Sequence, residues 1–179
     1  SESVRCHMGV TLAVEELFFE SRSGKIPKNS SEAQKSWKSN CFVFEVDGLK
    51  EASRRIKKVD AFTIKQQVLE FQTGDSRIPQ KVPGRIQYPS ITIYIPEVDA
   101  KPFFDHFTKT TLRGQREAGR RTASLTILDD AKKELCRVDF DGVAIASIGP
   151  DQSNSTSNNI KEAKIELTIE TLKFKYKAK

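Results

Sequence analysis

The side chains that most often perform catalysis or bind metal are few in this sequence, and they stand far apart. Its two histidines are His7, directly after Cys6, and His106, in the second half of the chain. A zinc site needs three or four Cys or His ligands at short spacings such as Cys-x-x-Cys, and no such spacing occurs. A catalytic thiol needs a base and a third group that orients this base, and the sequence identifies no such group beside Cys6 and His7. We therefore expect no zinc site and no nucleophilic centre.

The acidic residues and glycines give no better basis for a catalytic or metal site. Four aspartates lie near one another in sequence: Asp129, Asp130, Asp139 and Asp141. Their spacing does not match a calcium-binding loop, and turns at strand ends explain them better. Gly24 and Lys25 lack the glycine-rich loop that precedes a phosphate-binding lysine, and no Gly-x-Gly-x-x-Gly motif occurs. The sequence thus predicts a protein that is not an enzyme and that has no catalytic residues, no metal site and no cofactor.

The composition is typical of a folded, soluble domain. The 179 residues are enough for one domain with a real core, and 37% of them are hydrophobic while 30% are charged. No apolar run approaches the roughly 20 residues that cross a bilayer, and the first residues do not have the pattern of a signal peptide. Three cysteines at wide spacing do not suggest a disulfide framework, which favours a reducing compartment. We expect no membrane anchor.

The net charge of +6 is concentrated in three basic clusters. They lie at Lys50–Lys58, at Lys109–Arg121 and at the C-terminal end from Lys173 onward. Such clusters attract phosphate groups or an acidic partner, although charge runs are more often solvated loops and strand ends. They leave open a monomeric, basic nucleic-acid-binding β-barrel, which would bind single strands through charge and aromatic stacking.

Residues 1–39 are predicted to form an N-terminal arm and linker, followed by a β domain at residues 40–179. One set of apolar residues repeats with the period of an amphipathic helix: Val10, Ala13, Val14, Leu17 and Phe18. The alternation of Val10, Leu12 and Val14 also fits a short strand, so both interpretations remain open. Residues 21–39 are rich in Ser, Lys and Asn and contain Gly24 and Pro27, which is typical of a linker.

From Cys41 onward, apolar and polar residues alternate with the period of β-strands that bury one face. Such segments occur at residues 42–46, 62–71, 91–95, 123–127, 136–140 and 143–145. Between the second and third of them, Pro83-Gly84 has the composition of a turn, because Pro fixes φ and Gly accepts positive φ. We therefore expect a long loop over residues 73–90 with basic residues at its rim. A contact surface explains this loop better than a reaction site does.

The C-terminal segment predicts an unusually long strand from Ile160 to Lys177. Its apolar residues change parity after Thr171, which a bulge near Glu170-Thr171 would absorb while bending the strand. Strands of globular domains usually have about 5 to 6 residues. Long strands with unpaired edges associate with other chains unless they are covered, charged or closed into a ring. The length of this strand therefore favours a wall that is shared between subunits.

One helix interrupts the strands. Asp99 is predicted to cap it, Pro102 fits its first turn, and Gly114 is placed to end it. Its apolar stripe consists of Ala100, Phe103, Phe104, Phe107 and Thr111, with His106 on the opposite side. We interpret this element as a core helix that covers apolar surface left by a curved sheet.

The order of these segments resembles that of the tail-tube proteins of contractile phages, a family that also forms the inner tube of phage-derived contractile injection systems. The series begins with Phe42-Val43-Phe44-Glu45-Val46-Asp47-Gly48-Leu49, Val68-Leu69-Glu70-Phe71-Gln72-Thr73-Gly74-Asp75, Lys81-Val82-Pro83-Gly84-Arg85 and Ile91-Thr92-Ile93. It continues with the helix near Phe103–Phe107 and ends with Gly149-Pro150-Asp151, a Ser/Asn run and the strand Ile165–Glu170. The resemblance extends over residues 40–177.

The resemblance implies a mainly β fold with one α-helix, in which curved antiparallel sheets form a split-barrel subunit of a ring or tube. Members of the family form hexameric rings whose sheets merge into one tube, and a long loop reaches the neighbouring ring. Transferred by position, the inter-ring stacking loop includes Arg77, Lys81, Pro83, Gly84, Arg85 and Tyr88. The inter-subunit sheet includes Ile165, Leu167, Ile169, Leu172 and Phe174, and the core helix carries Phe103, Phe104 and Phe107.

The function that the resemblance implies is that of a structural tube subunit which forms a conduit for cargo. Its partners would be other copies of itself, a sheath protein, baseplate and tube-initiator or terminator proteins, and DNA or a protein effector in the lumen. It would assemble in the bacterial cytoplasm and become part of a virion tail or an injection particle. The long arm leaves a tube initiator at the baseplate as an alternative, beside the more distant nucleic-acid-binding β-barrel.

Overall fold

A computed structural model describes residues 8–21, 23–24, 40–72, 74, 78–114 (without the side chain of Leu112), 121–151 and 161–176. Its strands are β1 (Phe42–Val46), β2 (Lys58–Val59), β3 (Lys65–Phe71), β4 (Gln80–Gln87), β5 (Ile91–Pro96), β6 (Arg121–Leu128), β7 (Glu134–Pro150), β8 (Glu162–Thr168) and β9 (Thr171–Tyr176). Its helical segments are α1 (Lys50–Ser53), the 3₁₀ turn Glu97–Asp99, α2 (Lys101–Phe107) and the π-helical turn Thr108–Leu112. A mainly antiparallel β fold with one substantial helix is therefore confirmed.

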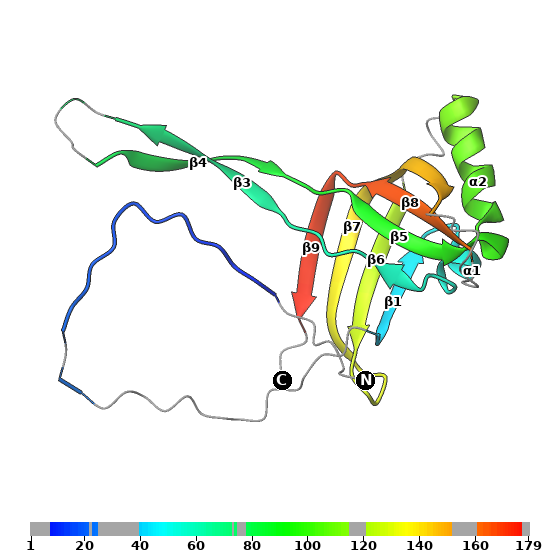
Figure 1. The fold of residues 1–179 in the computed structure, drawn as a ribbon, viewed down its shortest axis with the longest axis horizontal. Coiled ribbons are helices and arrows are strands. Elements are labelled where there is room, and N and C mark those ends of the chain that lie inside the picture. The colour runs from blue at the N-terminus through cyan, green and yellow to red at the C-terminus, as the bar shows by residue number, and fades with distance from the viewer. Residues whose placement is uncertain are drawn as a thin grey trace, which may run out of the picture.

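Two sheets organise the molecule. Seven strands form one curved sheet in the order β1-β6-β7-β8-β5-β2, with β9 paired to β7, while β3 and β4 form a separate two-stranded sheet. Figure 1 shows β3 and β4 as a long ribbon that projects from one end of the body, whereas α1 and α2 lie at the other end. We call residues 65–87 the ribbon. The seven-stranded sheet does not close, because in the described part of the chain its end strands β1 and β2 do not pair with each other.

The long strand β7 holds the body together. It has 17 residues, pairs with β6 on one side, and pairs with β9 and then β8 on the other. The strands β8 and β9 thus follow one another along the same edge of β7, separated by Ile169 and Glu170. The single long strand predicted from Ile160 to Lys177 was wrong, because the chain forms two separate strands here. They separate at the place where the parity change predicted a bulge. The partner strand bends at the same level, where Gly142 has a positive φ of 67°.

The core lies on one face of the curved sheet. Its buried side chains come from alternating positions of β1, β5, β6, β7 and β8, as expected for strands with one face in the interior. In β7 these positions are Cys136, Val138 and Phe140, followed by Val143 and Ile145 after the phase change at Gly142. Each parity change in the sequence therefore marks a bend of the sheet, and the apolar side chains keep to the same side of it.

The predicted core helix is present, but its stripe and its cap differ from the prediction. Phe103 is completely buried and Phe107 packs against the core, whereas Phe104 is 38% exposed. The N-cap residue is Ala100, without a side-chain capping hydrogen bond, so the capping role of Asp99 was wrong. Asp99 lies inside the preceding 3₁₀ turn, which leaves its side chain out of position for capping. After α2 the π-helical turn ends at Leu112 with Arg113 as its C-cap, and Gly114 follows with a φ of +69°, which fits the predicted helix stop.

The predicted loop at residues 73–90 is largely a strand, and the Pro83-Gly84 turn was wrong. Both residues lie inside β4, where the register shifts so that Gly84 and Arg85 together face Gln67. Gly84 fits closely there, since an added Cβ would lie 3.0 Å from the backbone oxygen of Gln67. The Pro-Gly pair therefore forms a β-bulge, which also tolerates proline within a strand.

The arm has neither of the two structures that its pattern suggested. Residues 8–21 are assigned to no helix and no strand, so the amphipathic helix was wrong. The apolar side chains of this segment are exposed, from Met8 to Phe19. Most of the predicted linker, residues 25–39, lies outside the described residues. In the described part of the chain, no helix is long and apolar enough to cross a membrane.

Candidate assembly interface

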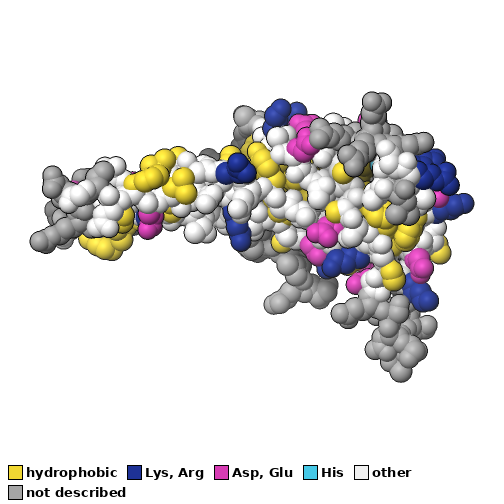
Figure 2. All heavy atoms as spheres, turned by 90° about the horizontal axis from the view of Figure 1, so that it is seen from above, with side chains coloured by type: hydrophobic (Ala, Val, Ile, Leu, Met, Phe, Trp, Pro, Cys, Tyr) yellow, Lys and Arg dark blue, Asp and Glu magenta, His cyan; other side chains and the backbone are white. Residues whose placement is uncertain are grey.

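The ribbon has one mainly apolar face and one mixed face. Residues that pair directly across an antiparallel ladder point to the same side, so Leu69 and Val82 share a face with Phe71. These three side chains are exposed, and we call them the apolar ribbon face. Figure 2 shows hydrophobic side chains gathered along the projection. Exposed apolar surface on a projection of this kind is typical of a binding surface.

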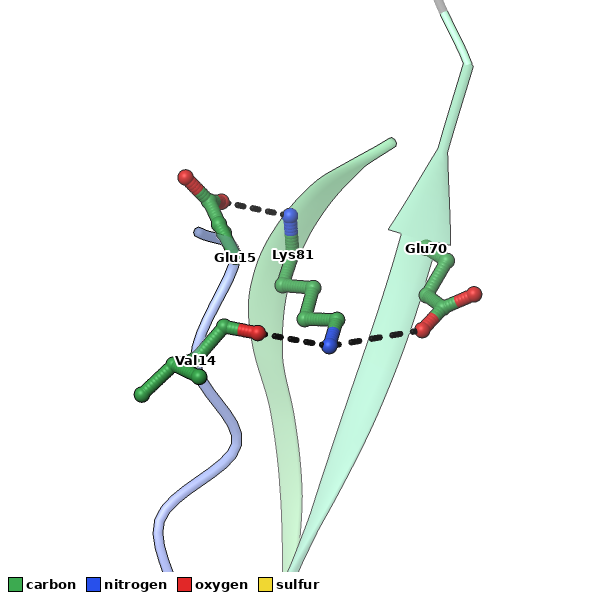
Figure 3. Close-up of polar contacts among 4 residues, drawn as sticks. All are labelled: Val14, Glu15, Glu70 and Lys81. Carbon is green, nitrogen blue, oxygen red and sulfur yellow. Dashed lines mark hydrogen bonds and ion pairs between the residues drawn. The ribbon is translucent and has the colours of Figure 1, made fainter. Parts of the chain in front are cut away.

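The opposite ribbon face carries Lys81, one of the predicted stacking residues. Its backbone N–H donates to Glu15 Oε1 at 2.6 Å, and its Nζ donates to the backbone oxygen of Val14 at 2.8 Å. The same ammonium lies 3.8 Å from Glu70 Oε1 on the neighbouring strand (Figure 3). The structure thus brings Lys81 together with the arm, which the sequence did not indicate because the two segments lie far apart in the chain.

The other predicted stacking residues are spread along the ribbon. Arg85 is exposed at the bulge beside Pro83 and Gly84, and Tyr88 is half-buried just after β4 ends. Arg77 lies outside the described residues. The predicted set therefore lines one strand and its end instead of the rim of a loop.

The residues predicted for the inter-subunit sheet separate into two groups. Ile165 and Leu167 are buried in the core, and β8 is hydrogen-bonded to β7 and to β5. Ile169 and Leu172 are half-buried against the same core. Phe174 in β9 is exposed and stacks on Tyr176. Of the five, Phe174 is therefore the best placed to touch another molecule.

The seven-stranded sheet presents open edges at β1, at β9 and at the two-residue strand β2. In the described part of the chain, β1 pairs with β6 alone and β9 pairs with β7 alone. The backbone groups on the outer side of each strand have no ladder partner there, which makes each edge a template for another strand. Together with the apolar ribbon face, these edges form the candidate assembly interface.

The sequence matches the family described as T4-like virus tail tube protein gp19 over residues 38–173. The chain belongs to this family. Its resemblance to tail-tube proteins is thereby confirmed, and the chain is a structural tail tube protein. The match does not include residues 1–37, which form most of the predicted arm and also lie outside the resemblance. No curated protein sequence matches the chain.

Solved structures with the same fold come from contractile injection systems. A chain of the PVC sheath-tube complex in its extended state matches with a TM-score of 0.65 at 17% identity, covering 86% of this chain and 99% of that chain. A chain of the tube-terminating cap of the anti-feeding prophage matches with a TM-score of 0.66 at 14% identity, covering 88% and 96%. A chain of the PVC sheath/tube terminator matches with a TM-score of 0.64 at 19% identity, covering 75% and 92%. At these identities the likeness establishes the fold.

This tail tube protein also carries a charged groove on the sheet face opposite its core. Acidic and basic side chains from β1, β7, β9 and the segment after β1 line the groove: Glu45, Asp47, Lys50, Arg137, Asp139, Asp141, Lys173 and Lys175. Asp139 accepts from Lys175 Nζ at 2.6 Å and from Arg137 Nε at 2.7 Å, and these two cations lower the pKa of Asp139. The sequence had suggested a turn for Asp139, which lies in the middle of β7 instead.

The prediction that His106 lies opposite the apolar stripe of the helix was wrong, because His106 is buried together with Phe103. It is buried beside Arg121, whose Nε lies 3.2 Å from His106 Nε2. Burial, together with the charges of Arg121 and Lys109, lowers the pKa of His106. Arg121 also donates to the backbone oxygen of Asp47, so the pair joins α2 to the end of β1. These contacts account for His106 structurally, and no group of three or more His, Cys, Asp or Glu side chains that could hold a metal ion occurs among the described residues.

Proposed function

We propose that this tail tube protein is a subunit of the inner tube of a contractile tail or tail-like injection system, in which hexameric rings stack into a conduit. The observation that carries the proposal is the combination of the open sheet edges at β1 and β9 with a projecting apolar ribbon in one chain. An isolated molecule leaves both features unsatisfied, whereas a ring uses the edges and a stack of rings uses the ribbon.

Ring closure follows from the order of the strands. The half of the sheet that ends in β1 and β9 contains β1, β6, β7 and β9, each antiparallel to the next. Because this number is even, β9 of one copy meets β1 of an identically oriented neighbour in antiparallel register. Repetition of this head-to-tail contact around an axis closes a ring and covers the edges at β1 and β9. In this arrangement Phe174 and Leu172 lie at the junction, while Ile165 and Leu167 support the wall from within each subunit.

Stacking of the rings is assigned to the ribbon. It projects away from the body (Figure 1), and its apolar face would be removed from water by contact with a copy in the adjacent ring. We place Lys81, Pro83, Gly84, Arg85 and Tyr88 in or beside this contact, together with Arg77. A contact that does not close on itself generates a filament, which is the geometry of a tube.

The proposed role is passive and needs no catalytic step. The domain at residues 40–179 forms the tube wall, and residues 1–39 form an arm attached to it. Partners would be a sheath protein outside the tube, baseplate and initiator or terminator proteins at its ends, and DNA or a protein effector in the lumen. Assembly would take place in the bacterial cytoplasm before the tube becomes part of a virion tail or an injection particle.

Sedimentation velocity over a range of protein concentrations tests this proposal. We expect one discrete ring species at low concentration and larger stacks of the same ring as the concentration rises. A chain that sediments as a monomer at every concentration, in low and in moderate salt, would contradict the proposal.

A tube initiator at the baseplate is the second candidate function, because the chain carries an arm that the family match largely leaves out. An initiator would form rings that do not stack until a baseplate protein is added. Rings that polymerise alone would exclude this role. The nucleic-acid-binding barrel is not carried forward, because the described sheet is open and the chain belongs to a tube family.

A further inference from the structure

The contact between the arm and the ribbon is the feature of this chain that neither the family match nor the proposed function explains. Lys81 holds the arm at two points, since its N–H donates to Glu15 Oε1 and its Nζ donates to the oxygen of Val14. The side chain of Lys81 is only 25% exposed although it lies on a projecting ribbon. Figure 3 shows its ammonium between the arm on one side and Glu70 on the other. One lysine therefore ties three segments together.

The ribbon requires additional contacts of this kind to be stable. A two-stranded antiparallel ribbon is marginally stable in water, and a third strand or a packed element is usually required to hold it. Here β3 and β4 pair only with each other in the described part of the chain. Because the N–H of Lys81 donates to Glu15, a backbone group on the outer edge of β4 is hydrogen-bonded to the arm. The arm also touches the body, where the hydroxyl of Tyr176 lies 3.2 Å from Met8 Sδ.

The contacts between the arm and the ribbon leave the apolar side chains of both segments exposed. Lys81 shares the mixed ribbon face with Glu70, so the arm attaches at that side and the apolar ribbon face stays free. Along the arm, side chains from Val10 to Phe19 are also exposed, several of them by more than two thirds. The ribbon and the attached arm therefore each present a strip of exposed apolar side chains to a partner. A second copy of this chain supplies matching apolar strips, since it carries the same two segments.

We propose that residues 8–21 are an assembly element: Lys81 fastens this arm to the outer edge of β4, and arm and ribbon together form the surface on which the next copy of the chain docks. This inference rests on the proposed stacking function and adds the arm to it. The arm does not simply cover the ribbon, because its contacts with Lys81 are polar and the apolar side chains of both segments remain exposed.

Two charge reversals at neighbouring positions test the proposal. The variant Glu15→Lys replaces the carboxylate that receives the Lys81 N–H with a cation beside the Lys81 ammonium. The control Glu16→Lys makes the same change of net charge one residue away. Since exposed charge pairs are weak, we expect Glu15→Lys to raise the protein concentration needed for stacking by about threefold or more relative to Glu16→Lys. A chain that begins at residue 25 should form rings but stack still less readily.

The outcomes separate this inference from the proposed function. Rings that stack equally well in wild type, in Glu15→Lys and in the shortened chain would overturn the role of the arm and leave the tube proposal intact. Equal losses in Glu15→Lys and Glu16→Lys would also overturn it, because the effect would then belong to net charge. A wild-type chain that forms no rings would contradict the proposed function itself. Circular dichroism checks that each variant is folded, and Glu15→Lys retains the whole chain if the shortened one is not.

Discussion

Single residues determine where the sheet of this tail tube protein bends, and Gly142 is the clearest case. Its φ is +67°, and an added Cβ would lie 2.5 Å from Cγ of Glu170. An L-residue in the left-handed region costs about 1–2 kcal/mol, so we expect Gly142→Ala to lower the free energy of unfolding by about that amount. Gly149→Ala is the matched control in the same strand, because its Cβ would meet no atom within 4 Å. Equal chemical denaturation midpoints for the two variants would contradict this account of the bend.

His106 makes stability depend on pH at the residue scale. Its pKa in the folded chain is lowered from 6.5 by burial and by Arg121 and Lys109. The folded state therefore binds its proton less readily than the unfolded state, and the full stability is present above the unfolded pKa. As the pH falls below about 6.5 toward the lowered pKa, the unfolded state gains a proton first and stability is lost.

We expect His106→Gln to reduce this loss, because glutamine does not titrate. Urea denaturation at pH 7.5 and at pH 5.5 measures the difference for the wild type and for the variant. The carboxylates with shifted pKa values, Asp60 and Asp139, are shifted downward from 3.8 and so do not titrate in this window. A variant that loses as much stability as the wild type would show that His106 is not the responsible group.

Among the elements, the ribbon is proposed to form the contact between rings, and substitutions on its two faces should have different effects. Leu69 and Val68 are neighbours, each 40% exposed, but they point to opposite faces of the ribbon. Because Leu69 belongs to the apolar ribbon face, we expect Leu69→Ser to raise the concentration needed for stacking by about tenfold. Val68→Ser should have a smaller effect. Turbidity or pelleting over a concentration series measures both, and an equal effect of the two variants would argue against docking through the apolar face.

The elements also differ in how far the sequence could predict them. Strand alternation located β1, β5, β6 and β7, and the parity change after Thr171 located the break between β8 and β9. The second ribbon strand, β4, was missed because Pro83-Gly84 has the local composition of a turn, whereas pairing with Gln67 converts it into a bulge. A helix was wrongly predicted for the arm because its apolar residues repeat with a helical period. The arm instead makes hydrogen bonds with Lys81, far along the chain. In both cases a long-range contact decides the structure, and a local pattern contains no information about it.

At the scale of the whole molecule, the open edges at β1 and β9 predict a directional contact between copies. We consider a chain with Val43→Cys in β1 and Lys173→Cys in β9, in which the native Cys6, Cys41 and Cys136 are replaced. A short bis-maleimide should link this double variant into a ladder of covalent oligomers that stops at one ring size. The ladder reports how many copies close the ring.

Each single-cysteine chain is the control for this experiment. A head-to-tail contact between β9 and β1 gives no ladder with either cysteine alone, because each link needs one residue of each kind. Efficient dimers from Lys173→Cys alone would instead indicate a two-fold contact between two β9 edges. Such a contact cannot generate a ring of this design and would contradict the proposed closure.

The most direct measurement is electron cryo-microscopy of the purified chain at a concentration at which it assembles. We predict stacked rings in which β9 of each copy continues into β1 of the next, with the ribbon and the arm lying between adjacent rings. Single particles of one chain with both sheet edges in solvent, or assemblies joined through other surfaces, would contradict this account.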